Sequence, residues 1–150
     1  IFNINIKNPE GYKDYGFGDK IPPGADLVFE VELLRVDLTG YRLHIDGALV
    51  MIDVDTAIIN PTQLPFWFLG KLKELGIRTI EVHPDDPSGV VNCIAVKPGR
   101  VIMEAGASKH TADALDKLGI EIVPVKYDKV FQGGGGIHCS TSPLIRDSVD

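Results

Sequence analysis

The order of apolar and polar positions along the chain predicts short strands interrupted by two helices. Strand-like runs are expected at 43–53, 57–59, 79–82, 93–96, 100–103 and 120–125. A helix capped by Thr62 and closed by Gly76 is expected between the second and third runs. Its apolar side chains recur every three or four residues: Leu64, Phe68, Leu72 and Leu75. A second helix is expected at about 108–118, so the pattern predicts an α/β fold.

An internal repeat organises these elements. The segment 72–77 (LKELGI) returns 43 residues later as 115–120 (LDKLGI), and apolar strand positions recur at the same offset on both sides. Each copy is a ββαβ unit of about 40 residues, which cannot cover its own apolar faces. We therefore expect the two units to pack together, with further cover from an oligomer or from additional blades N-terminal to them.

The first 36 residues do not belong to the repeat. Turn-forming Gly, Pro, Asp and Lys prevail up to Gly24, and one extra β-strand is expected at Leu27–Val36. The composition changes near Asp37. We expect a boundary there, between an N-terminal segment at 1–36 and a domain at 37–150.

Composition and charge narrow the classes of function. The 150 residues are 44% hydrophobic and 24% charged, as in a globular domain with a core. A net charge of -6, without a dense Lys/Arg block, argues against a nucleic-acid partner. No apolar run reaches the roughly 18 residues that cross a bilayer, so no membrane partner is expected. The two cysteines, Cys93 and Cys139, suit free thiols in a reducing compartment, which favours a cytoplasmic location.

The tail holds the first candidate for chemistry, a run of four glycines ending at Gly135 and Gly136 and followed closely by His138 and Cys139. Glycines let the backbone approach a ligand closely, although such a run is also typical of a flexible linker. Cys139 is a candidate nucleophile because a nearby cation or hydrogen-bond donor favours the thiolate. The alternative is a cysteine that serves as a small buried apolar residue.

The second candidate is the pair His44 and Asp46. Two residues apart on a strand, they would share one face at a separation of about 7 Å, while Leu43 and Ile45 face the core. An imidazole beside a carboxylate suits proton transfer and cation binding. The alternative is an exposed polar face of a half-buried strand. Ligand spacing for a metal and the fingerprints of phosphate-binding loops are both missing, so we expect neither a metal nor a cofactor.

The segment LHIDG at 43–47, followed about 90 residues later by GGGIHCST at 134–141, resembles the superfamily of arginine deiminases, dimethylarginine dimethylaminohydrolases and amidinotransferases. The resemblance covers about 37–147. It implies a pentein-type fold, an α/β propeller of five ββαβ blades around a polar site. Two of these blades would lie here.

The resemblance also implies roles for single residues. Cys139 would attack the central carbon of a guanidinium group, and His44 would protonate the departing amine and then activate the water or amine that releases the product. Asp46 would pair with the guanidinium N–H groups of arginine or a derivative. Gly135, Gly136 and His138 would complete the substrate-binding site.

The expected activity of these residues alone is low. The family carries further carboxylates in blades before the His-x-Asp segment, so we expect weak or no hydrolysis without them.

A second resemblance concerns the N-terminal segment. Residues 12–36, including IPPGADLVFEVELL at 21–34, resemble the last strand of FKBP-type prolyl isomerases. The leading hypothesis is a guanidine-modifying hydrolase or transferase. A non-catalytic fragment, or a binding domain completed by a partner, is the alternative; prolyl isomerase activity is the least favoured interpretation.

Overall fold

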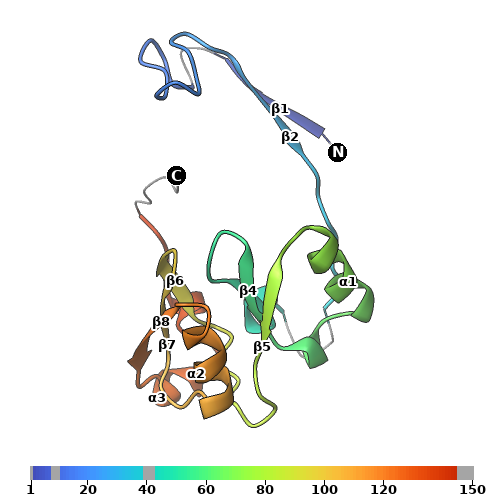
Figure 1. Ribbon diagram of the computed structural model, residues 1–150, viewed down its shortest axis with the longest axis vertical. Coiled ribbons are helices and arrows are strands. Elements are labelled where there is room, and N and C mark those ends of the chain that lie inside the picture. Colours follow the sequence, from blue (N-terminus) through green and yellow to red (C-terminus); the bar gives the residue numbers. More distant parts are fainter. Residues whose placement is uncertain (1, 8–10, 39–42, 145–150) are drawn as a thin grey trace. The chain divides into compact units, whose positions relative to one another are not determined.

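The computed structural model describes residues 2–7, 11–38 and 43–144. The chain divides into two compact units, Ile1–Arg35 and Val36–Asp150, called here the N-terminal segment and the C-terminal domain. Four residues between Leu38 and Leu43 lie outside the described ranges. Figure 1 labels most of the helices and strands of both units.

The N-terminal segment contains a two-stranded antiparallel ribbon. Strand β1 (Phe2–Ile6) pairs with β2 (Leu27–Val31) in a register that sets Ile6 opposite Leu27. The expected strand at Leu27–Val36 is therefore too long, and β1 was not expected at all. Beyond Val31 the backbone has no partner strand among the described residues, and Leu33 is 76% exposed, so its apolar character alone does not extend the strand.

The C-terminal domain contains the ββαβ unit twice. The first repeat comprises β3 (Leu49–Met51), β4 (Thr56–Ile59), α1 (Phe66–Glu74) and β5 (Arg78–Glu81). The second comprises β6 (Ile94–Lys97), β7 (Arg100–Glu104), α2 (Lys109–Asp116) and β8 (Glu121–Val125). In each three-stranded sheet the first two strands pair antiparallel and the last two pair parallel. The α/β fold and the internal repeat expected from the sequence are present.

Both helices end in the same way, which explains the repeated sequence. Gly76 and Gly119 have φ of 73° and 72°, a conformation that favours glycine. The amides of the residues that follow them, Ile77 and Ile120, bond back to the carbonyls of Leu72 and Leu115 at 2.9 and 3.1 Å. This is the Schellman arrangement, and it turns each chain directly into the parallel strand.

The start of α1 differs from the expectation. Asn60, rather than Thr62, caps a short 3-10 turn, η2 (Pro61–Gln63), and α1 begins only at Phe66. Pro65 explains the delay, because a residue that precedes proline avoids helical backbone angles, and Leu64 is extended. Leu75 was expected on the buried side of the helix but is 54% exposed, whereas Leu64, Phe68 and Leu72 are buried.

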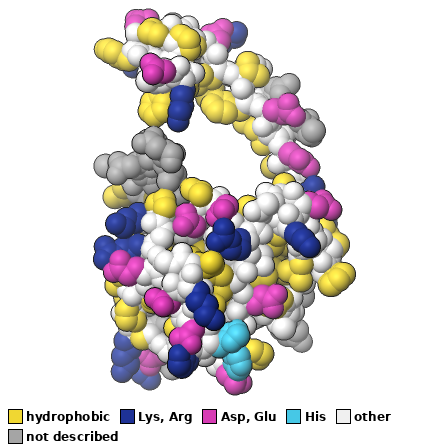
Figure 2. All heavy atoms as spheres, in the orientation of Figure 1, with side chains coloured by type: hydrophobic (Ala, Val, Ile, Leu, Met, Phe, Trp, Pro, Cys, Tyr) yellow, Lys and Arg dark blue, Asp and Glu magenta, His cyan; other side chains and the backbone are white. Residues whose placement is uncertain are grey.

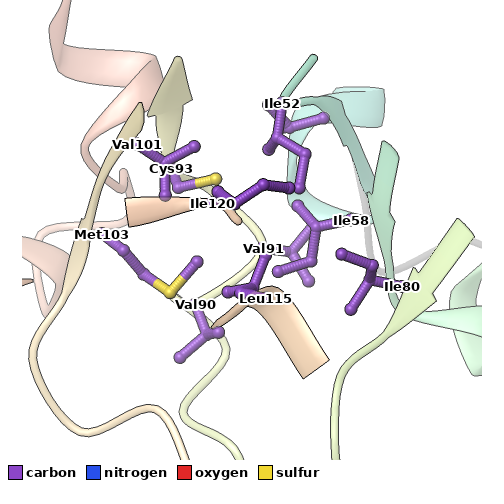
Figure 3. Close-up of a cluster of buried hydrophobic side chains, with 11 residues drawn as sticks. Ile52, Ile58, Ile80, Val90, Val91, Cys93, Val101, Met103, Leu115 and Ile120 are labelled. Carbon is purple, nitrogen blue, oxygen red and sulfur yellow. The ribbon is translucent and has the colours of Figure 1, made fainter. Parts of the chain in front are cut away.

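One buried cluster joins the two repeats. On β4, whose residues alternate between the two faces of its sheet, Ala57 and Ile59 pack in a cluster with Phe68 and Leu72 of α1. Ile58 points the other way, into a second cluster that draws on both repeats. Figure 3 shows this shared core, formed by Val50, Ile52, Ile58, Ile80, Val90, Val91, Cys93, Val101, Met103, Leu115 and Ile120. Helix α2 accordingly contacts β5 of the first repeat as well as β8 of its own.

A carboxylate also connects the repeats. Asp86 lies in the loop between them and accepts hydrogen bonds from the backbone amide of His83 at 2.8 Å, the backbone amide of Ser108 and the hydroxyl of Thr111. Ser108 caps α2 by accepting a bond from the amide of Thr111. Burial opposes ionisation of Asp86, but the bonds from Thr111, Ser108 and His83 outweigh it and hold the pKa of Asp86 below its ordinary value.

The lowered pKa of Asp86 predicts how stability depends on pH. The native state favours the ionised form, so the stabilisation is present above the ordinary aspartate pKa of about 3.9 and is lost as the pH falls through the lower folded value. We expect Asp86→Asn to lower the urea midpoint at pH 7 and to flatten its decline from about pH 5 to pH 3. Asp53→Asn is the matched control; an equal decline in wild type and Asp86→Asn would contradict this account.

Charges of both signs are interspersed on the face of the C-terminal domain that Figure 2 shows. Charged pairs of the domain include Arg100 with Glu121, at 2.6 Å, and Lys71 with Glu74, at 3.6 Å. None of the helices in the described ranges combines the length and the apolar character needed to span a bilayer.

Candidate functional site: a thiol, a carboxylate and two histidines

A hollow in the C-terminal domain gathers residues from distant parts of the sequence. Its volume is about 370 Å³. The lining comes from the segment before β3, from the loop between the repeats and from the glycine-rich tail: Leu43, His44, Asp46, Gly47, Ser88, Asn92, Phe131, Gly134, Gly136 and Cys139. His44 and Cys139, 95 positions apart in the sequence, thus face one space.

Asp46 connects the two chain segments. Its Oδ2 lies 3.2 Å from Sγ of Cys139, which donates the thiol hydrogen, and 3.1 Å from Nδ1 of His138. The carboxylate is 18% exposed, so it is accessible from the hollow and partly shielded from water. The imidazole of His138 is charged only when protonated, and it then forms an ion pair with Asp46.

The local backbone at His44 and Asp46 is not the expected strand. Residues Ile45–Gly47 form a 3-10 turn, η1, in which the amide of Ala48 donates to the carbonyl of Ile45 at 2.7 Å. An Asp-Gly pair favours such a turn over extended structure. The prediction that Leu43 and Ile45 face the core is consequently wrong, because they are 94% and 38% exposed. His44 still has an extended backbone, with φ of -126°, and lines the hollow.

The glycine-rich tail is a compact turn rather than a linker. After α3 (Asp128–Phe131) the amides of Gly133 and Gly134 bond to the carbonyls of Val130 and Phe131, both at 2.9 Å. Gly134 has φ of 102°, which strongly favours glycine. A second 3-10 turn, η3 (His138–Ser140), then presents His138 and Cys139 on consecutive positions of one turn, and both reach Asp46.

Asn92 is the site residue that sequence reasoning missed. It is 3% exposed and lies just before β6 among buried apolar neighbours. Its Nδ2 donates to the carbonyl of Asp46 at 3.1 Å and to Sγ of Cys139 at 3.2 Å, while Oδ1 accepts the amide of Cys139 at 3.2 Å. A single amide inside the apolar run VVNCIAV at 90–96 was the available signal, since a buried amide needs partners.

Asn92 also explains why position 136 is glycine. A Cβ built on Gly136 would lie 2.6 Å from Cγ and 2.7 Å from Cβ of Asn92, and closer still to its Oδ1. A Cβ on Gly135 would instead meet Cβ of Cys139 at 3.4 Å, an ordinary contact. The close approach therefore requires glycine at 136 and brings the tail directly against Asn92.

The pKa of the carboxyl group in the site is lowered, whereas that of the thiol in the core is raised. Burial opposes ionisation of Asp46, but hydrogen bonds from Cys139, His138 and Asn92 and the charge of His138 outweigh it, so the pKa of Asp46 lies below its ordinary value. Asp46 is thus ionised at neutral pH. In contrast, Cys93 is fully buried, and desolvation raises the pKa of its thiol to about 12.

A neighbouring carboxyl group behaves differently from Asp46. Glu104, on β7, is 6% exposed, and desolvation followed by the charge of Asp128 raises its pKa above the ordinary value. Its side chain fits only because residue 89 is glycine, where a Cβ would overlap with Glu104 and lie 3.3 Å from the ring of Phe131. Desolvation thus shifts the pKa of Glu104 upwards, whereas hydrogen bonds shift that of Asp46 downwards.

The structure brings most of the candidate residues together. Four of them line the hollow: His44, Asp46, Gly136 and Cys139. His138 is not in the lining but lies within hydrogen-bond distance of Asp46. Gly135 precedes Gly136 on the same turn, against Cys139. Among the described residues, Asp46 is the only carboxylate in the lining, and the ring of His44 makes no hydrogen bond to Cys139. The arrangement brings a thiol, a carboxylate and an imidazole to one open site.

Solved structures share this fold. The inosamine-phosphate amidinotransferase of Streptomyces griseus matches with a TM-score of 0.58 and 19% identity over 71% of this chain and 33% of its own. DDAH from Pseudomonas aeruginosa, complexed with citrulline, matches with a TM-score of 0.54 and 23% identity over 67% of this chain and 36% of its own. The N-terminal domain of ArgZ, covalently bound to a reaction intermediate, matches with a TM-score of 0.61 and 17% identity over 72% of this chain and 40% of its own.

Two families match different parts of the chain. Residues 1–34 match the family of FKBP-type peptidyl-prolyl cis-trans isomerases. Residues 71–146, half of the chain, match the family described as arginine deiminase, which confirms the resemblance seen in the sequence. The chain spans about a third of the length of the solved structures it matches. Its fold, its repeat and the family match over the second half lead to one conclusion: the chain belongs to the arginine deiminase family.

Proposed function

We propose that the C-terminal domain carries part of the active site of a guanidine-modifying enzyme, a hydrolase or transferase that acts on C–N bonds of arginine or a related guanidino compound. The observation that carries the proposal is the contact of Cys139 Sγ with Asp46 Oδ2 at 3.2 Å, at the edge of an open hollow. A guanidinium cation that pairs with Asp46 would bring its central carbon next to the sulfur.

The proposed chemistry uses Cys139 as a covalent nucleophile. The thiol passes its proton to His44, which lines the same hollow, and the thiolate forms a bond to the guanidinium carbon, giving a tetrahedral adduct. The adduct collapses as the C–N bond breaks and the amine leaves with a proton from His44, which faces the same hollow. Water or an acceptor amine, deprotonated by His44, then attacks the amidino-thioether and releases the thiol.

Asp46 has two proposed roles in this sequence. Ionised at neutral pH, it supplies a carboxylate to the planar cation, a pairing favoured by charge-assisted hydrogen bonds. In the free site the same oxygen accepts the hydrogen of Cys139, so a bound cation replaces the thiol as its partner. His138, already bonded to Asp46, and the backbone at Gly135 and Gly136 complete the proposed substrate-binding site.

The remaining carboxylates are proposed to come from further ββαβ units of a pentein-type propeller. A single lining carboxylate, Asp46, can satisfy only one side of a guanidinium group, which presents N–H donors in several directions. Apolar side chains are also exposed on α1 and at the hollow, where Phe66 is 90% and Leu43 is 94% exposed. A partner or further blades would cover such surfaces. The same exposure supports the alternative of a binding domain completed by a partner.

A pair of alkylating reagents tests the proposal. 2-Chloroacetamidine is a cation shaped like a guanidinium group, and 2-chloroacetamide is its neutral counterpart; both form a thioether and release chloride. For each reagent, the rate of alkylation of Cys139 is divided by the rate at which the same reagent alkylates a free thiol, which removes the difference in intrinsic reactivity. We expect the cation to react about tenfold faster after this correction, because a charged hydrogen bond contributes about 1.5–3 kcal/mol.

The control variant is Asp46→Asn, which keeps the shape of the side chain and removes its charge. The preference for the cation should fall to near unity in this variant, whatever the absolute rates. A corrected ratio near unity in the wild-type protein would contradict a guanidinium site at Asp46.

A further inference from the structure

We infer that Asn92 is the residue that holds and activates the nucleophile, by donating an amide hydrogen to the sulfur of Cys139. The inference rests on the proposed use of Cys139 as a nucleophile and adds a component to that site. Asn92 lies in the loop between the repeats, outside both segments that carry the family resemblance in the sequence, 43–47 and 134–141. The geometry points to it for three separate reasons.

The first reason is that both N–H donors and the oxygen of the side chain have partners at this site. One hydrogen of Nδ2 goes to the carbonyl of Asp46 at 3.1 Å and the other to Sγ of Cys139 at 3.2 Å. Oδ1 accepts the amide of Cys139 at 3.2 Å. Asn92 thus binds Cys139 at both its backbone and its sulfur, and it ties the cysteine to the turn that carries Asp46.

The second reason is that these partners determine the orientation of the amide. If the oxygen and nitrogen were exchanged, an oxygen would face the carbonyl of Asp46, and an NH₂ group would face the N–H of Cys139. Both contacts would be repulsive, so the network selects the orientation with N–H directed at the sulfur. A donor aimed at sulfur stabilises the thiolate more than the thiol, because hydrogen bonds to charged acceptors are stronger.

The third reason is that the surrounding backbone packs closely around Asn92 and bonds to it. The carbonyl of Asn92 accepts the amide of His138 at 3.1 Å, so its main chain also holds η3. Gly136 passes so close to the Asn92 side chain that any Cβ would displace it. At 3% exposure, Asn92 is shielded from bulk water, which favours keeping the donor directed at Cys139.

The opposing charge makes such a donor necessary. A thiolate at Cys139 would form 3.2 Å from the carboxylate of Asp46, which is ionised at neutral pH and repels it. His138 offsets this charge only when protonated, and His44 makes no hydrogen bond to the sulfur in the described structure. The Asn92 N–H is a donor at every pH. It therefore supports the thiolate before and after proton transfer by the histidines.

The test is the pH dependence of alkylation of Cys139 by iodoacetamide. This reagent is neutral, so the result does not depend on whether the site binds a guanidinium cation. Asn92→Asp keeps the shape and the Oδ1 acceptor but directs a negative oxygen at the sulfur. We expect its rate at pH 7 to fall about tenfold or more relative to wild type, and its rate at pH 10, where thiols are largely ionised, to change less than twofold.

Two controls separate this role from a structural one. Asn60→Asp makes the same substitution at η2, keeps the acceptor for Thr62 and should leave both rates unchanged. The buried Cys93 reports folding in each variant, because it becomes labelled only when the core opens. A misplaced tail would change the rates at pH 7 and pH 10 by the same factor.

Asn92→Ala removes the donor without adding charge and decides the question if Asn92→Asp does not fold. Equal rates at pH 7 in wild type and Asn92→Ala, with Cys93 protected, would overturn the inference. In the wild-type protein, the ¹⁵N-labelled side-chain amide of Asn92 should also shift with the same midpoint as the alkylation rate. That shift should disappear in Cys139→Ser; an amide that does not respond to ionisation of Cys139 would equally overturn it.

Discussion

Chloroacetamidine at pH 7 should modify Cys139 at least about a thousand times faster than Cys93. Desolvation raises the pKa of Cys93 to about 12, so only about 10⁻⁵ of it is thiolate at pH 7. Cys139 is exposed, so the reagent reaches its sulfur and water can solvate a thiolate there. The suppressed ionisation of Cys93 and its full burial, which keeps the reagent from the sulfur, act in the same direction and together give the expected factor.

The measurement is the mass of each cysteine-containing peptide as a function of time. Cys139→Ser should abolish the fast adduct, and Cys93→Ser should leave it unchanged. In urea, where the core is open, both cysteines of the wild-type protein should react at comparable rates, which shows that Cys93 is protected rather than inert. Equal labelling of the two cysteines in the folded protein would remove Cys139 from the proposed mechanism.

Leu115→Ala should destabilise both repeats together, by about 2–5 kcal/mol. Leu115 is fully buried in the shared core, where it packs with Ile58 and Ile80 of the first repeat, and its truncation leaves a cavity. Leu118, on the same helix terminus, is 40% exposed. The matched variant Leu118→Ala should therefore cost less than about 1 kcal/mol.

A single tryptophan allows the two repeats to be followed separately. Trp67 lies on α1 of the first repeat, away from the site of the substitution in α2. In urea titrations of Leu115→Ala, the midpoints from Trp67 fluorescence and from far-ultraviolet circular dichroism should fall by the same amount. An unchanged fluorescence midpoint would show that the repeats unfold independently and that the shared cluster does not couple them.

The elements of the C-terminal domain were predictable wherever local signals agreed with packing. The repeated LKELGI and LDKLGI segments specify an apolar turn, a glycine with positive φ and the start of a strand, and all three are local properties. The strand β4 was predictable in the same way, because a run of apolar residues bounded by turns suits a strand buried on both faces. These segments need no information from distant parts of the chain.

Predictions failed where a single residue interrupts a pattern. Pro65 postpones α1 although the apolar spacing begins at Leu64, and the Asp-Gly pair at Asp46 converts an expected strand into η1. Leu75 has the spacing of a buried residue, yet it lies at the C-cap, where the helix leaves the sheet. The spacing of apolar residues predicts which face of a continuous helix or strand is buried. It no longer predicts burial at the residue where that element ends.

The sequence identified candidate site residues but not the contacts among them. Cys139, His44 and Asp46 were identified from residue types and their resemblance to a family. The contacts of His138 and Cys139 with the same oxygen of Asp46 depend on η3, a turn that the sequence pattern did not predict. Asn92 was missed because its role depends on tertiary contacts with residues more than forty positions away in both directions.

The shared core has a consequence for how such a chain tolerates genetic rearrangement. Every side chain of the two buried clusters comes from Val36 or later, so a recombination breakpoint just before that residue transfers the clusters intact. A breakpoint between β5 and β6 would instead divide one cluster and expose Ile58 and Ile80 on one product and Leu115 on the other. The two repeats should accordingly be inherited as one block, whereas sequences joined before Val36 are free to be exchanged.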